Sequence, residues 1–163
     1  MNKKYILVIL LLFLFASCTS NEVTKKDESD YDVEMFTPDL KVDFKEVYSW
    51  INLMPGPDAQ ARFNITGEFE IFQTSDYDFS RMNLTLIKIF QDKELIYSIK
   101  PEIRIDDKRS TNESKFIIFG TIKGLLPDPK LNTEGVIDAQ FIFTEDDELY
   151  SHLIKNVKID KAY

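Results

Sequence analysis

The stretch RFNITGEFEI, residues 62–71, alternates between apolar and polar side chains. In an extended chain a period of two places every second side chain on the same face. This pattern predicts a β-strand with one buried face and one solvated face, which is usual in antiparallel sheets. The predicted buried face carries Phe63, Ile65, Phe69 and Ile71.

Further strand patterns follow at short intervals along the chain. Residues 83–90 and 95–99 flank the polar sequence Gln91-Asp92-Lys93-Glu94, which predicts a hairpin. Ile103 and Ile105 continue the second strand beyond Pro101, where we expect an edge or an interruption because proline lacks the N–H that a sheet needs. The other predicted strands are residues 41–51, 115–123, 136–144 and 149–159.

Two of these segments carry more detailed expectations. Residues 115–123 have apolar side chains on both faces, with Ile122 on the same face as Phe116, which predicts a central strand. Residues 41–51 could form a helical stripe, but their β-branched and aromatic content favours a strand. In residues 136–144 we expect Ile137, Ala139, Phe141 and Phe143 to point inward.

Several short strands separated by turns predict an all-β fold, a single antiparallel β-sandwich spanning residues 35–163. Its architecture resembles the immunoglobulin-like folds, although the cysteine and tryptophan signature of antibody domains is absent. A small barrel is the main alternative. Roughly 130 residues suffice for one domain with a real core, so no second domain is expected.

The N-terminus has the order of an export signal: lysines, an apolar run and small residues. Ala16-Ser17-Cys18 resembles the cleavage site of bacterial lipoproteins, in which the cysteine receives a lipid, although Phe15 stands where leucine is usual. The resemblance implies a signal peptide at residues 1–17 and lipidation of Cys18. Unlipidated secretion or an uncleaved N-terminal anchor are the alternatives.

Residues 18–34 are polar, and we expect them to form a flexible tether between the lipidated cysteine and the domain. In the lipoprotein family an aspartate directly after the cysteine often retains the protein in the inner membrane. Thr19 stands there instead, which implies the outer membrane of a Gram-negative cell envelope.

The charge and the residue types bound the chemistry of the chain. Twenty basic residues stand against 28 acidic ones, a net charge of −8, which becomes −10 once Lys3 and Lys4 leave with the signal peptide. An acidic protein is repelled by phosphate, so we expect no nucleic-acid partner. With one cysteine and one histidine in the whole chain, we also expect no disulfide, no tetrahedral zinc site and no cofactor.

Candidate catalytic groups are sparse. His152 alternates with Leu149 and Leu153 in a predicted strand, so we expect it to point outward without a catalytic role. The carboxylates cluster in turns, where solvation explains them, and a carboxylate-based hydrolase is a minor hypothesis. Asp76-Tyr77-Asp78 places oxygen ligands at alternate positions, as loose calcium loops do, but lacks the glycine and distal glutamate of an EF-hand.

The most unusual segment is residues 48–57, which hold the only tryptophan, two prolines and a glycine. One interpretation is a rigid loop that presents Trp50 and Met54 to a partner, because aromatic anchors on ordered loops dominate binding energy. The simpler interpretation places Trp50 in the core. The leading functional hypothesis is a non-enzymatic interaction module that binds an envelope protein, and the alternative is a sugar- or peptide-binding lipoprotein.

Overall fold

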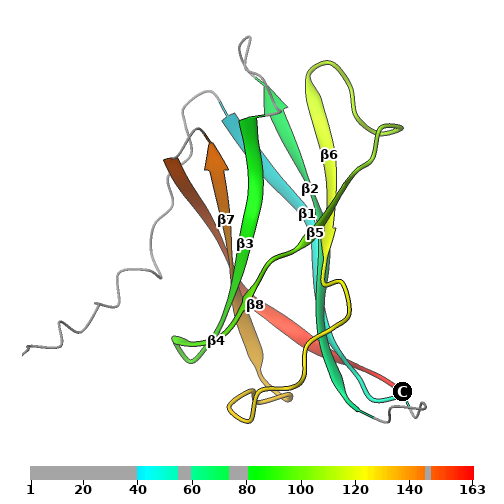
Figure 1. Ribbon diagram of the computed structural model, residues 1–163, viewed down its shortest axis with the longest axis vertical. Helices are drawn as coiled ribbons and strands as arrows, with labels where there is room; N and C mark the ends of the chain where they lie inside the picture. The colour runs from blue at the N-terminus through cyan, green and yellow to red at the C-terminus, as the bar shows by residue number, and fades with distance from the viewer. Residues whose placement is uncertain (1–39, 55–59, 74–80, 146–147) are drawn as a thin grey trace, which may run out of the picture.

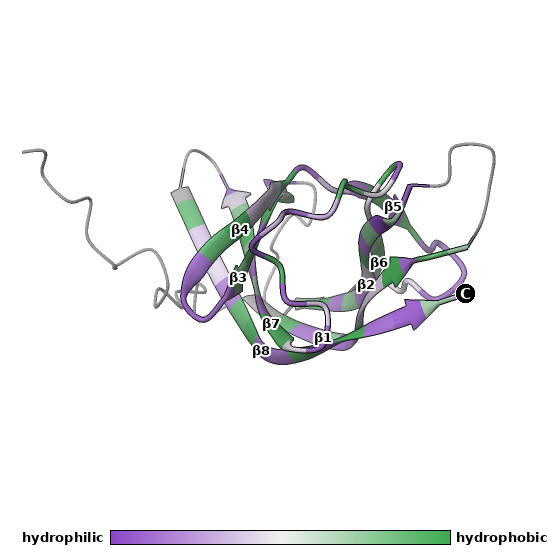
Figure 2. Cartoon of the chain, turned by 90° about the horizontal axis from the view of Figure 1, so that it is seen from below, coloured by the Kyte–Doolittle hydropathy of each residue, from purple (hydrophilic) through white to green (hydrophobic). Residues whose placement is uncertain are grey.

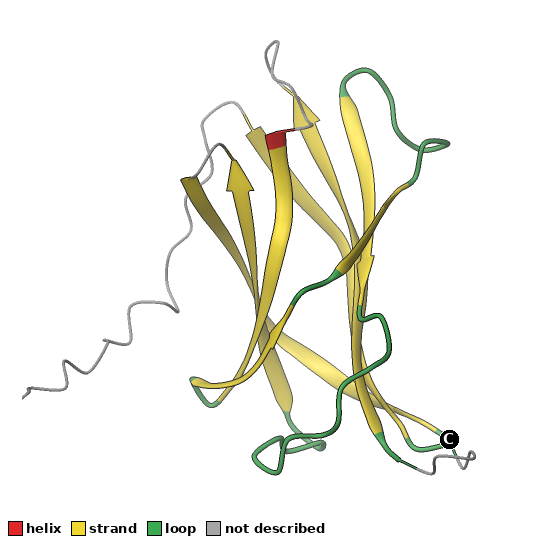
Figure 3. Ribbon diagram, viewed as in Figure 1, coloured by secondary structure: helices red, strands yellow, loops and turns green. Residues whose placement is uncertain are grey.

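The structure, a computed structural model, describes residues 40–54, 60–73, 81–145 and 148–163. The described elements are strands joined by loops, with a single helical residue at Arg81, which confirms the all-β prediction (Figure 3). The strands are β1 Leu40–Asn52, β2 Arg62–Gln73, β3 Met82–Gln91, β4 Glu94–Ile99, β5 Glu102–Ile105, β6 Ser114–Gly120, β7 Val136–Glu145 and β8 Glu148–Ala162. No helix in the described ranges is long and apolar enough to cross a membrane.

The strands form one sheet in the order β4-β3-β7-β8-β1-β2-β6-β5. The sheet curls so that β4, β3 and β7 face β1, β2, β6 and β5, as in a sandwich (Figures 1 and 2). Neighbouring strands pair antiparallel except β1 and β8, whose last residues run parallel from the pair Ser49–Ile159 to the pair Asn52–Ala162. The sheet is therefore mixed, whereas the sequence pattern predicted antiparallel pairing alone.

Strand β8 connects the two layers because it bends near Asn156. Residues up to Lys158 pair with β7, and residues from Ile159 onward pair with β1. Asn156 adopts a φ of 59°, which asparagine tolerates better than most residues, and its N–H donates to Asp138 Oδ1 at 2.9 Å. The pairing of β7 with β8 shifts register at this bend, between Ile137 and Ala139, where β8 holds one residue more than β7, as expected of a β-bulge that turns a strand.

The chain also crosses between the layers at Pro101. Strand β4 pairs with β3 in one layer, and after the buried Pro101 the chain continues as β5 beside β6 in the other layer. The two edge strands of the sheet are thus consecutive in sequence, as Figure 1 shows. The interruption predicted at Pro101 is confirmed.

The core lies between the two layers and is rich in phenylalanine. Phe44 is partly buried and packs against this core, with its ring centroid 4.4 Å from that of Phe141 and 5.2 Å from that of Phe69. The hydropathy of the chain alternates along the strands in Figure 2, consistent with one inward and one outward face. The predicted inward side chains are confirmed as buried: Phe63, Ile65, Phe69, Ile71, Ile137, Ala139, Phe141 and Phe143.

Strand β6 is shorter than predicted. It ends at Gly120, and Ile122 lies outside it with 69% of its surface exposed, so the predicted extension to residue 123 is wrong. The chain turns here because Gly124 takes a φ of +64°, where a Cβ would lie 2.7 Å from Asn64 Oδ1. Leu125 then pairs with Phe63, which closes the turn against β2.

Candidate functional site

The candidate site is the outer face of the layer formed by β1, β2, β6 and β5. Its composition depends on a register shift in β1 between Phe44 and Glu46. Before the shift Val42 and Phe44 pack against the core, and after it Ser49 and Ile51 are buried. The shift moves the inward positions from even to odd numbers, because a bulge adds one residue to the strand.

As a result, Tyr48 and Trp50 point outward. Trp50 is half-buried and lies between Asn64 of β2 and Asp160 of β8 in the strand register, and it is not part of the core cluster. The interpretation of Trp50 as a core residue is therefore wrong. Tyr48 is 51% exposed beside Thr66, and a hydrogen bond to the Glu46 carboxylate raises the pKa of its phenol.

Met54, the second residue predicted for binding, follows the end of β1 and is 54% exposed. The backbone is held in place there: Leu53 N–H donates to Ala162 O at 2.8 Å, and Met54 N–H donates to Asn52 Oδ1 at 2.9 Å. Pro55, Gly56 and Pro57 lie outside the described residues. We call Tyr48, Trp50, Leu53 and Met54 together the Tyr48–Met54 surface.

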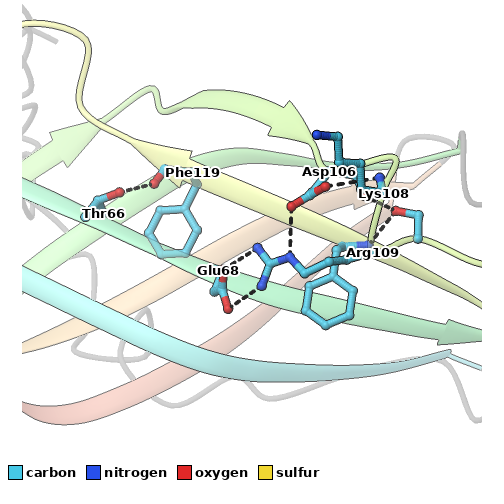
Figure 4. Close-up of polar contacts among 8 residues, drawn as sticks. Thr66, Glu68, Asp106, Lys108, Arg109 and Phe119 are labelled. Atoms are coloured by element: carbon cyan, nitrogen blue, oxygen red, sulfur yellow. Dashed lines mark hydrogen bonds and ion pairs between the residues drawn. The ribbon is translucent and has the colours of Figure 1, made fainter.

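A second feature of the same face is an ion-paired cluster around Arg109, on the loop between β5 and β6 (Figure 4). The Arg109 guanidinium donates to both carboxylate oxygens of Glu68, at 2.9 and 2.6 Å, and to Asp106 Oδ2 at 2.8 Å. Its carbon lies 4.6 Å from the centre of the Phe116 ring. The loop is thereby fastened to the face of β2 and β6.

The charges in this cluster determine what it can do chemically. Hydrogen bonds from Arg109 are the main cause of lowered pKa values at both Glu68 and Asp106. A glycosidase needs one carboxyl group with a raised pKa as its general acid, and a paired guanidinium acts in the opposite direction. These two carboxylates are therefore suited to holding the loop rather than to donating a proton.

A shallow pocket of about 240 Å³ with a mixed polar and apolar lining lies above Gly120 on this face. The pocket lies in line with Tyr48 across the sheet. Tyr48 pairs in register with Thr66, and Thr66 pairs in register with Gly120. Thr66 Oγ1 donates to Phe119 O at 2.7 Å, as Figure 4 shows, so this hydroxyl proton is already used. The remaining polar lining is Glu102, Arg104 and Thr121.

Comparison with known proteins adds no information at this site. No protein-family model, curated protein or solved structure matches this chain. The functional interpretation therefore depends on the sequence and on the geometry of the face itself.

His152 lies on the other layer and points inward, so the prediction that it faces outward is wrong. Its ring stacks on Phe44, with centroids 4.8 Å apart and an angle of 16° between the planes. The register explains the orientation, because His152 pairs with Phe141, which is fully buried. The contacts of His152 are those of a residue that packs against the core.

Two other sequence predictions concern residues that the structure does not describe. Cys18 and the Asp76-Tyr77-Asp78 segment both lie outside the described ranges. Within those ranges no group of three or more histidine, cysteine, aspartate or glutamate side chains is arranged to hold a metal ion.

The Arg109 cluster and the outward position of Tyr48 were not predicted from the sequence. The register shift did leave a signal, because the apolar positions change from Val42 and Phe44 to Val47 and Ile51. A change from even to odd numbers within one strand indicates a bulge. The pairing of Glu68 with Arg109 left no such signal, since 41 residues separate them.

Proposed function

We propose that this protein is a lipid-anchored, non-enzymatic interaction module of the bacterial cell envelope, in the outer membrane, that binds another envelope protein. The signal-like residues 1–17 and Cys18 support the anchor. Two or more acyl chains on Cys18 would hold the protein stably at the membrane, because a single chain binds only marginally and reversibly. The acidic net charge supports a protein partner over nucleic acid.

The Tyr48–Met54 surface is the observation that carries the proposal of a protein partner. It combines an exposed tyrosine with a half-buried tryptophan on a strand that is hydrogen-bonded on both sides, by β2 and β8. Tyrosine and tryptophan are enriched among the residues that dominate binding energy, and a rigid backbone keeps the ordering cost small. An exposed aromatic surface on a rigid strand is suited to a protein face.

Co-purification from mildly solubilised membranes tests the proposal. Truncating a tryptophan at the centre of an interface costs about 2 kcal/mol or more, so Trp50→Ala should weaken partner binding roughly 30-fold. Leu149→Ala is the matched control, because Leu149 is an exposed apolar residue at the start of β8, in the other layer. Equal recovery of all partners by Trp50→Ala, Leu149→Ala and the wild type would refute this contact surface.

The anchor has a separate test. Cells grown with radiolabelled palmitate should label the wild-type protein, and Cys18→Ser should abolish both the label and the membrane attachment. A wild-type protein that carries no label, or a Cys18→Ser variant that stays membrane-bound, would contradict the anchor while leaving the Tyr48–Met54 surface untouched.

A second candidate function, binding of a small ligand such as a sugar or a peptide, is favoured by the pocket above Gly120. Arg104 and Glu102 of this pocket lie on the same sheet face as Tyr48. Polar groups beside an aromatic ring are typical of ligand sites. Trp50 is the only tryptophan, so intrinsic fluorescence reports this face without background. A saturable change that Arg104→Ala abolishes would favour ligand binding over the protein partner.

A further inference from the structure

The crossover at Pro101 leaves part of β3 without a neighbour. Strand β7 pairs with β3 from Met82 to Phe90, whereas β4 pairs only from Ile87 to Gln91. Because the chain leaves this layer after Ile99, no described strand lies beside residues 82–86 on the side away from β7. The backbone groups that β3 presents there form an open edge of the kind that pairs with another strand.

Strand β5 has an open edge as well, since β6 is its one neighbour among the described strands. Ile103 and Ile105 pair in register with Phe119 and Ile117, which are buried, so their side chains point into the space between the layers. They are nevertheless 40% and 43% exposed. Two inward-facing isoleucines are left uncovered at the point where β4 would continue.

The two open edges border one groove between the layers. It has a volume of about 240 Å³ and is mostly apolar, with one lysine and one asparagine in its lining. An apolar groove beside unpaired strand edges fits an extended segment whose alternate side chains are apolar, because the backbone completes the sheet and the side chains fill the groove. The lining is Phe69, Met82, Asn83, Leu84, Ile103, Ile105, Lys115 and Ile117.

We propose that residues 31–35 of the same chain dock in this groove as an added strand beside β3. The sequence there is Tyr-Asp-Val-Glu-Met, so Tyr31, Val33 and Met35 share one face and the two carboxylates share the other. The apolar face would cover Ile103 and Ile105. Asp32 and Glu34 would remain in water.

The length of chain before β1 fits this placement. Four residues, 36–39, separate Met35 from Leu40, and five peptide steps reach about 17 Å. Strand β1 is three strands away from both β3 and β5 in the sheet order, a separation of about 14 Å along the sheet in either direction. The start of β1 also lies at the same end of the molecule as the start of β3 (Figure 1).

The direction of the chain fits too. Strands β1 and β3 both run away from this end of the molecule in Figure 1, so a segment that rises to meet Leu40 is antiparallel to β3. This docking does not depend on the proposed function.

Hydrogen exchange tests the docking. It is measured on protein extracted from membranes, so that the N-terminus is in the form that processing in the cell produces. Amides of residues 82–86 and 103–105 should exchange at least 10-fold more slowly in the wild type than in Val33→Asp combined with Met35→Asp. Asp32→Asn combined with Glu34→Gln changes the other face of the segment and should exchange as the wild type does. Equal exchange in all three proteins would overturn the proposal.

Cross-linking provides a second measurement that does not depend on destabilising the segment. With Val33→Cys and Ile105→Cys in one chain, a mild oxidant should form an internal disulfide, and Glu34→Cys with Ile105→Cys should give less than a tenth of that yield. Light scattering on the wild type should give a monomer. A dimer with disulfides between two chains would assign the groove to a second copy and overturn the proposal.

Discussion

The Tyr48–Met54 surface and the groove between β3 and β5 both expose apolar side chains, but they differ in their backbone. Strand β1 is hydrogen-bonded to β2 and β8 at the level of Trp50, so only side chains are available for binding there. In the groove the edges of β3 and β5 are open, so backbone groups are available as well. The state of the backbone therefore separates a surface for a folded partner from a site for an extended segment.

The largest effect is expected where the two regions share a core. Phe141 is fully buried and lies within 5.1 Å of both Phe44 and Phe119, measured between ring centroids. Phe141→Ala should lower the free energy of unfolding by about 3–5 kcal/mol, because it leaves a cavity between the layers. Urea denaturation measures this. A loss below about 1 kcal/mol would mean that the two layers are not packed as described.

The spacing of β1 and β2 is expected to have the next largest effect. A Cβ at Gly67 would collide with the carbonyl oxygen of Glu46 and lie 2.7 Å from the Phe119 ring. Gly67→Ala should lower the free energy of unfolding by about 3 kcal/mol, the upper end for overpacking, because a backbone oxygen moves less readily than a side chain. Gly120→Ala is the matched control, since its Cβ would lie 3.2 Å from a threonine hydroxyl and should cost less.

The sequence correctly predicted the strands whose outward-facing side chains are polar. It failed where the pairing of strands depends on residues that are distant in sequence. Phe63 to Ile71 and Ile137 to Phe143 were placed correctly because a strand with one buried face must alternate. The parallel contact of β1 with β8 joins residues about 110 positions apart, and no local pattern encodes it.

The candidate site was predicted only in part for the same reason. Trp50 lies in strand β1 and not on a loop, and the interpretation that placed it in the core was wrong because one bulge residue reverses every side chain that follows. The predicted orientation of the His152 side chain was also wrong, because its environment is set by Phe44, which belongs to a strand that is distant in sequence.

The two regions should respond independently to substitution. Trp50→Ala should reduce partner binding by about 2 kcal/mol and leave the exchange of residues 82–86 unchanged. Val33→Asp with Met35→Asp should do the reverse, because changes at separate sites with no shared contacts are additive. Binding and hydrogen exchange measured on both variants and on their combination decide this. A variant that alters both readouts would show that the regions are coupled.

The smallest effect is expected at the Arg109 cluster and should depend on pH. Glu68 has a folded-state pKa below its ordinary 4.5, so its ion pair contributes stability above that pH and loses it as the pH falls through the lowered value. The stability difference between the wild type and Arg109→Gln should therefore shrink as the pH falls from about 5 to about 2, the range in which carboxylates become protonated. Arg104→Gln on the neighbouring strand is the control, and an unchanged Arg109→Gln difference across this range would contradict the pairing.

The central claim, that the Tyr48–Met54 surface contacts a protein partner, is tested most directly by site-specific photo-cross-linking in living cells. A photoreactive residue at position 48 should produce one dominant adduct with a second protein, and the same residue at position 149 should produce none. Adducts of equal yield at both positions, or no adduct at position 48 in a folded and correctly localised protein, would contradict the claim.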